Sequence, residues 1–221
     1  MTAKEALEHL CSNDTEEQLA TLRELSVLKA MPELYDITVA NLASPDNGVV
    51  FFSLDMLIKK YPIQVQRDAK LLTPKLLQLL TTNNGPVVDR AIWALSVTGE
   101  NSINELIECI TSSTDDRSKE MCTWALGRNA HIHQHPTLVM YTLRSLLLDI
   151  NPHIQYVALN ALMDMSPLRP FERLAGDNYD FEPLYTELEA IAQALLKIYS
   201  GKQEWLERYL ELLRNRHKPS N

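Results

Sequence analysis

The chain has 221 residues, of which 45% are hydrophobic and 23% are charged, and its net charge is −8 with an isoelectric point of about 5.3. This length suffices for one domain or a short repeat array with a sizeable core. The acidic balance argues against a nucleic-acid-binding protein, because such proteins show a basic surface. It favours solubility, or a basic partner.

No stretch approaches the roughly 20 apolar residues of a membrane-spanning helix, so no membrane partner is expected. The N-terminal segment MTAKEALEHLCSND contains no apolar run of signal-peptide length. The three cysteines, Cys11, Cys109 and Cys122, are far apart in the sequence. Cys122 falls in a column of small residues, which predicts a core thiol. We therefore expect a reducing, cytoplasmic environment.

The spacing of apolar residues predicts an all-helical chain. In chain order, the expected helices cover residues 2–10, 16–29, 32–42, 49–61, 63–81, 87–98, 102–111, 117–129, 137–149, 154–165, 184–199 and 203–216. Within the fifth of these, Thr73-Pro74 is expected to restart the helix, with threonine as the N-cap and proline in the first turn.

The prolines and polar turns divide the chain into three parts of one continuous domain. We expect a repeat array over residues 1–166 and a loop over residues 167–183, which contains Pro167, Pro170, Gly176 and Pro183. Residues 184–221 are expected to form capping helices, because a stack of repeats needs its last apolar face covered.

Five leucines mark equivalent positions of a repeat: Leu25, Leu57, Leu95, Leu126 and Leu162. Intervals of 31 to 38 residues separate them, which is typical of stacked helical repeats. Four residues before each leucine stands a small residue that allows a neighbouring helix to come close: Thr21, Ser53, Ala91, Cys122 and Ala158. A polar turn of turn-forming and N-cap residue types precedes each copy: Ser12-Asn13-Asp14, Ser44-Pro45-Asp46-Asn47-Gly48, Asn83-Asn84-Gly85-Pro86, Thr114-Asp115-Asp116 and Asn151-Pro152.

Two segments, Trp124-Ala125-Leu126-Gly127 and Ala94-Leu95-Ser96, carry a resemblance to a known family. The pattern resembles HEAT repeats, in particular the short HEAT-like repeats of the phycobilisome-lyase type, whose inner helix ends in Ala-Leu-Gly. The resemblance covers roughly residues 12–166. It implies an all-α, right-handed α-α superhelix (a HEAT-like solenoid) of about five helical hairpins with a C-terminal helical cap. It implies little about function.

In repeats of this type the Ala-Leu-Gly helix lines the concave face. Carrying this over gives the candidate partner-binding residues Trp93, Trp124, Asp55, Asp89, Arg90, Glu120, Arg128, Tyr156 and Asn160. Trp93 and Trp124 occupy the same register in adjacent repeats, so we expect them to be near neighbours. Tryptophan, tyrosine and arginine dominate interface hot spots, which favours a binding surface. The alternative is that both tryptophans pack between helices.

These features favour a non-catalytic scaffold or adaptor that binds a protein or peptide partner and needs no cofactor. The alternative is a lyase or ligand carrier for a bilin-like small molecule, in which Arg90, Arg128 and the two tryptophans would hold a planar acidic ligand; it depends on fold analogy alone. Asp55, Asp89 and Glu120 would repel nucleic-acid phosphates. The sequence does not indicate the partner's identity or the oligomeric state.

Two further segments can be interpreted either as functional sites or as ordinary surface connections. His131, His133 and His135 would point the same way on an extended segment and are weak candidate metal ligands. A polar connector is favoured, because zinc sites need three or four ligands and no cysteine or carboxylate lies at ligand spacing. Residues 177–189 are acidic with interleaved aromatics, which indicates a solvated loop and helix start, with a docking patch for a basic partner as the alternative.

Overall fold

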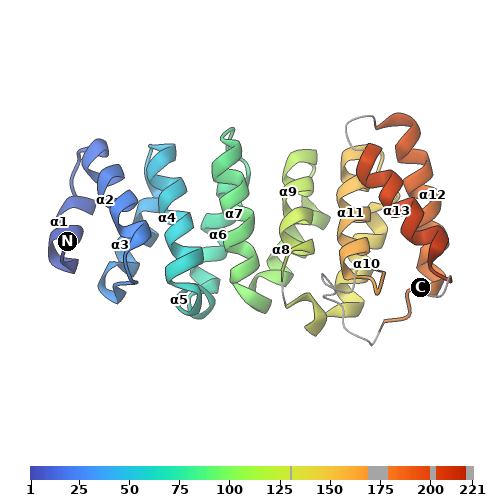
Figure 1. Cartoon of the computed structure of the whole chain (residues 1–221), viewed down its shortest axis with the longest axis horizontal. Helices are drawn as coiled ribbons and strands as arrows, with labels where there is room; N and C mark the ends of the chain where they lie inside the picture. Colours follow the sequence, from blue (N-terminus) through green and yellow to red (C-terminus); the bar gives the residue numbers. More distant parts are fainter. Residues whose placement is uncertain (130, 169–178, 200–202, 218–221) are drawn as a thin grey trace. The chain divides into compact units, whose positions relative to one another are not determined.

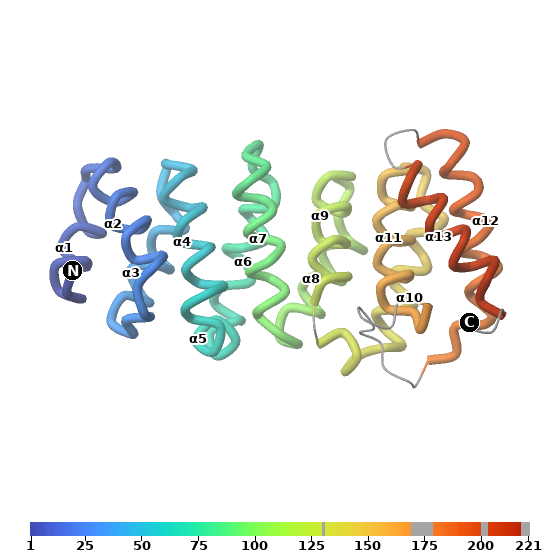
Figure 2. Tube along the Cα trace, viewed as in Figure 1, coloured from blue at the N-terminus to red at the C-terminus, as the bar shows by residue number. Residues whose placement is uncertain are grey.

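The computed structural model describes residues 1–129, 131–168, 179–199 and 203–217, and within these ranges the chain is helical and has no strand. The chain folds as two compact units, Met1–Glu105 and Leu106–Asn221. Their boundary falls inside α8 (Ile103–Ser112). Figures 1 and 2 show the helices of each unit in chain order. None of the described helices is both long and apolar enough to cross a membrane.

Unit 1 consists of hairpin-like helix pairs. Its helices are α1 (Ala3–Leu10), α2 (Thr15–Val27), α3 (Tyr35–Ala40), α4 (Asn47–Lys60), α5 (Pro62–Arg67), α6 (Ala69–Leu80) and α7 (Gly85–Val97), with short 3-10 helices at Pro32–Leu34, Asn41–Ala43 and Gly99–Ser102. The helix α4 packs against α2 on one side and against α7 on the other.

Unit 2 continues the same alternation. After α8 it contains α9 (Asp116–Gly127), α10 (Pro136–Leu146), α11 (Pro152–Met165), α12 (Glu182–Ile198) and α13 (Gln203–Asn215), with a 3-10 helix at Ile132–Gln134. The helix α11 packs against α9 and α10, and α12 packs against α11 and α13. We call α2, α4, α7, α9 and α11, which carry the repeated leucines, the inner helices.

Every inner helix begins at the same distance from its leucine. Side-chain oxygens accept hydrogen bonds from first-turn N–H groups at the N-caps Asp14, Asp46, Asn84, Asp115 and Asn151. Each cap lies 11 residues before the repeat leucine of its helix. Those five leucines are at most 3% exposed. The predicted repeat register is therefore confirmed, and each N-cap lies within its predicted polar turn.

Small residues determine how closely the inner helices approach. All five members of the predicted small-residue column are buried. At the end of α9, a Cβ atom added to Gly127 would lie 2.6 Å from the Cβ of Ala161 on α11. Real Cβ atoms do not approach so closely, so only glycine fits this contact without a shift of one helix.

We expect Gly127→Ala to lower the free energy of unfolding by about 1–3 kcal/mol, because the added methyl overpacks the α9–α11 contact. The matched control is Gly85→Ala at the start of α7, where an added Cβ meets nothing within 4 Å. Urea unfolding followed by circular dichroism measures both changes. Equal losses in the two variants would contradict the close-contact explanation.

The predicted restart at Thr73-Pro74 is wrong. The chain breaks instead at Asp68, between α5 and α6, and α6 runs through Pro74. Thr73 is not an N-cap: its side chain is buried, and its hydroxyl has no hydrogen-bond partner among the described residues. An interior proline removes one backbone hydrogen bond. Burial of one face of α6 offsets that loss, through Ala69, Leu72, Leu76 and Leu80.

The prediction for Cys122 is right about burial and wrong about its chemical state. Cys122 is buried, but its Sγ is bonded to that of Cys109, so a disulfide joins α8 to α9. The helices bring the two Cα atoms within 6.6 Å, inside the range that a disulfide spans. Cys11 is free and exposed.

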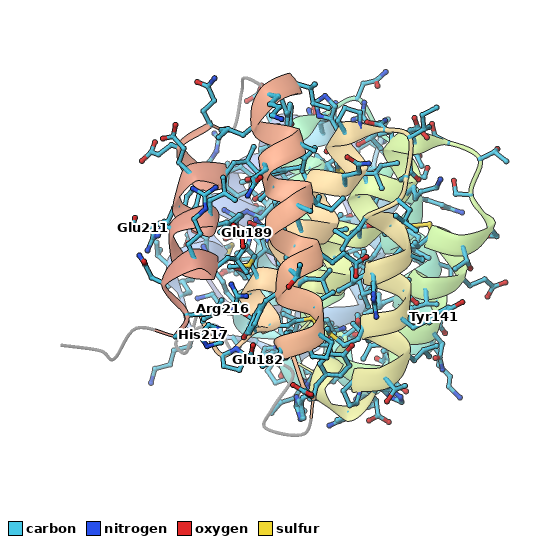
Figure 3. The ribbon with its side chains drawn as sticks, turned by 90° about the vertical axis from the view of Figure 1, so that its right-hand side faces the viewer. Tyr141, Glu182, Glu189, Glu211, Arg216 and His217 are labelled. Atoms are coloured by element: carbon cyan, nitrogen blue, oxygen red, sulfur yellow. A yellow bond between two sulfur atoms is a disulfide. The ribbon has the colours of Figure 1, made fainter. Side chains whose placement is uncertain are left out.

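Ion pairs fasten the two final helices, α12 and α13, to each other. Arg214 and Arg216 lie 3.1 Å and 3.8 Å from carboxylate oxygens of Glu189, and the guanidinium of Arg216 stacks over Tyr185. Figure 3 shows Glu182, Arg216 and His217 gathered near the end of α13. The acidic start of α12 is thus paired within the fold, where it is described.

The predicted loop over 167–183 is only partly described, because residues 169–178, which include Pro170 and Gly176, lie outside the described ranges.

Candidate functional site

In unit 1 the predicted site residues lie on α4 and α7, and they interact with each other. Asp55 is only 8% exposed, and its carboxylate is 2.8 Å from Lys59 Nζ and 3.6 Å from Arg90 Nε. The carboxylate is thus enclosed by two cations of its own chain. Asp55 therefore links α4 to α7, a role that sequence reasoning did not assign to it.

Arginine–aromatic stacking extends this surface along the inner helices. The guanidinium of Arg90 lies 5.4 Å from the ring centroid of Phe51, and that of Arg23 lies 5.6 Å from Phe52. Trp93 is 43% exposed, although it sits on an inner helix, and Asp89 one turn earlier is exposed as well. A tryptophan packed between helices would be mostly covered. The exposure of Trp93 therefore favours the binding-surface interpretation over the packing alternative.

In unit 2 the predicted residues of α9 and α11 form an aromatic cluster. Trp124 and Tyr156 meet edge to face, with ring centroids 6.4 Å apart and planes inclined by 64°. Arg128 stacks over Trp124, with its guanidinium 5.1 Å from the ring. Glu120 lies four residues before Trp124 on the same face of α9. Tyr156 is only 4% exposed, so it forms the buried floor of this cluster.

Two members of the cluster were missed by sequence reasoning. Tyr199, directly after α12, lies 5.4 Å from Tyr156 and 4.5 Å from His153, measured between ring centroids. Its hydroxyl is 2.8 Å from His153 Nδ1. Burial raises the pKa of Tyr199, and the negative charge of Glu120 raises it further. Tyr199 follows the repeats in sequence, so no repeat register pointed to it.

The side chain of Asn160 forms hydrogen bonds to two other residues of the chain. Its carboxamide oxygen accepts a hydrogen bond from the hydroxyl of Tyr209 on α13, and its nitrogen donates to Asp164 at 3.2 Å. Asn160 therefore attaches the final helix to α11. On α13 itself, Trp205 is 42% exposed and Arg208 stacks over its ring.

The histidine run does not form the extended segment that the metal-site alternative assumed. Residues 132–134 form a 3-10 helix, because the Gln134 and His135 N–H groups bond back to the carbonyls of His131 and Ile132. The rings of His131 and His133 stack 6.2 Å apart, and His131 Nδ1 lies 3.3 Å from Gln134 Nε2. Among the described residues, no three histidine, cysteine or acidic side chains are grouped so that they could hold a metal ion.

The predicted site residues thus form two separate groups, one in each unit. Asp55, Arg90 and Trp93 lie along α4 and α7 in unit 1, whereas Glu120, Trp124 and Tyr156 lie on α9 and α11 in unit 2. Because Trp93 and Trp124 belong to different units, their expected proximity stays a prediction.

No protein-family model and no curated protein matches the sequence. Solved structures match at low identity. The N-terminal domain of MAST/Orbit is 15% identical with a TM-score of 0.56, over 95% of this chain and 96% of that chain. An engineered protein is 19% identical with a TM-score of 0.52, over 97% and 98% of the two chains. A designed armadillo repeat protein in complex with the peptide (KR)4 is 18% identical with a TM-score of 0.50, over 97% and 99%.

At these identities the likeness concerns the fold alone. The resemblance to the phycobilisome-lyase type of repeat stays a prediction. The helix order, the repeated caps and the similar structures agree on one conclusion: this chain has an all-α repeat fold of the armadillo and HEAT-like kind.

Proposed function

We propose that the protein is a non-catalytic interaction scaffold whose inner helices bind a protein or peptide partner. The observation that carries this proposal is the exposure of Trp93 on an inner helix, beside the Asp55–Arg90 pair. Exposed aromatic and arginine side chains of this kind supply much of the binding energy at protein interfaces.

The aromatic cluster of unit 2 supports the same function. The rings of Trp124 on α9, Tyr156 on α11 and Tyr199 at the end of α12 lie in contact with one another. Rings held by neighbouring side chains lose little conformational entropy when a partner binds, which favours affinity. The designed armadillo protein in complex with (KR)4 offers a parallel from the same fold. Partner choice would depend on the charges around the rings, mainly Asp89, Glu120 and Arg128.

We expect the double substitution Trp93→Ala plus Trp124→Ala to abolish partner capture while leaving helicity unchanged, because both side chains would act as anchors. Immobilised protein is incubated with extract of the native cell, and the captured proteins are identified by mass spectrometry. Far-UV circular dichroism of each variant checks the fold.

The matched control is Trp205→Ala, which removes an equally exposed tryptophan from α13, 42% against 43% for Trp93. Capture that survives in this control and is lost in the double variant supports the proposal. If the double variant unfolds, the two rings are core residues and the proposal fails. Visible absorbance of the purified protein would instead support the alternative, a carrier or lyase for a bilin-like molecule.

A further inference from the structure

An exposed apolar strip runs along α10 and the turn that follows it. Leu138, Tyr141, Leu148 and Ile150 are all exposed, and they fall within one stretch of 13 residues. Figure 3 shows Tyr141 well apart from the paired side chains near the end of α13. Concentrations of exposed apolar side chains on a folded protein mark sites where another molecule docks.

The exposed residues of α10 form a seam of the kind that packs against another helix. Leu138, Tyr141, Ser145 and Leu148 are exposed and stand three, four and three residues apart, so they share one side of the helix and its last turn. The opposite side of α10 is buried in the core of unit 2. We call these four residues the α10 seam.

The spacing of the α10 seam is the same from either end, which favours a second copy of the chain as the partner. In a two-fold contact, any residue that meets a second residue of the other copy is itself met by the first. With the two α10 helices antiparallel, Leu138 comes opposite the other copy's Leu148, and Tyr141 comes opposite its Ser145. The large ring thus meets a small side chain. A parallel pair would instead oppose tyrosine to tyrosine and leave a gap at the serines.

The charges on this face are compatible with the same contact. The net charge of −8 opposes the approach of two copies. Arg144 is the one charged residue in the sequence of α10, and its Nε lies 2.7 Å from a carboxylate oxygen of Glu187 on α12. The α10 seam and its one ion pair therefore add no net charge to the contact.

We propose that the α10 seam is a self-association surface, on which two copies of this chain pair through antiparallel α10 helices. The contact uses one helix of each copy, which is small for a protein interface, so we expect a Kd on the order of 100 μM. The dilute protein used in unfolding experiments is then monomeric. This inference goes beyond the proposed function and is independent of it, because α10 is not one of the inner helices.

Sedimentation equilibrium of the full chain over a range of concentrations tests the inference. The apparent mass of the wild type should rise with concentration from the 25.2 kDa of one chain towards twice that value. Tyr141→Glu places a charge in the middle of both seams and should raise the Kd about tenfold or more. Far-UV circular dichroism checks that each variant is folded.

The matched control is Ile63→Glu on α5 of unit 1, because Ile63 is 78% exposed and Tyr141 is 77% exposed. This control adds the same charge and should leave the Kd unchanged. Equal weakening by both substitutions would show general charge repulsion and overturn the inference. A wild type that stays monomeric at all concentrations, or a dimer that survives Tyr141→Glu, would overturn it as well.

Disulfide crosslinking tests the antiparallel register without changing Tyr141. Leu138→Cys and Leu148→Cys are made as separate chains in a Cys11→Ser background and are oxidised alone and as a mixture. The mixture should give crosslinked dimers, because residues that face each other across the seam come within the reach of a disulfide. Each chain alone should stay uncrosslinked, since about 15 Å of helix separates like positions of antiparallel copies. Crosslinking of either chain with itself as efficiently as in the mixture would overturn the antiparallel contact.

Discussion

Replacing Leu126 by alanine is expected to lower the free energy of unfolding by about 3 kcal/mol, within the usual range for a buried leucine. Leu126 is completely buried on α9, which packs closely against α11. The truncation removes apolar contacts and leaves a cavity that the close Gly127–Ala161 contact hinders from collapsing. Urea unfolding monitored by circular dichroism measures the change as a shift in midpoint.

Leu148→Ala provides the control within the same unit, because Leu148 is 79% exposed. We expect its effect to stay within about 0.5 kcal/mol, as for most surface substitutions. If both substitutions lower the free energy of unfolding equally little, Leu126 is not a core residue. The repeat register that depends on it would then be wrong.

Opening the Cys109–Cys122 disulfide is expected to destabilise the protein by about 3 kcal/mol, the loop-closure estimate for a loop of about 15 residues. The bridge spans 13 residues and fastens α8 to α9. Cys109→Ser should therefore unfold at lower urea concentration than the oxidised wild type. Wild type treated with a thiol reductant should match the variant.

Cys11→Ser is the control, because Cys11 is free and exposed. Thiol alkylation followed by mass spectrometry provides a second readout. Oxidised protein denatured without reductant should take up one label, at Cys11, whereas reduced protein should take up three. Three labels without reductant would show that the bridge does not form.

The repeat could be predicted because its signals are local. A capping side chain such as Asp46 or Asn151, placed at a fixed distance from a buried leucine, specifies both the start and the inward face of an inner helix. The break at Asp68 was missed because it carries neither proline nor glycine. Pro74 was wrongly predicted to restart the helix, because burial of one face of α6 offsets the backbone hydrogen bond that the proline removes.

The site was predicted less completely, since a register gives the direction of a side chain but not its neighbours. Asp55 was expected to face a partner, yet Lys59 and Arg90 enclose its carboxylate. Tyr199 joins Tyr156 from a segment beyond the repeats. Such contacts depend on the packing of residues far apart in sequence, which no spacing rule reports.

The hydrogen bond between Tyr209 and Asn160 limits how modular this chain can be. Repeat arrays are commonly lengthened or shortened by whole units, and the terminal pair is then treated as an interchangeable lid. In this chain the terminal pair forms a specific hydrogen bond, because Tyr209 on α13 donates to the carboxamide oxygen of Asn160 on α11. A graft of α12 and α13 onto another array would have to include an asparagine at the acceptor position, or leave a buried tyrosine hydroxyl without its acceptor.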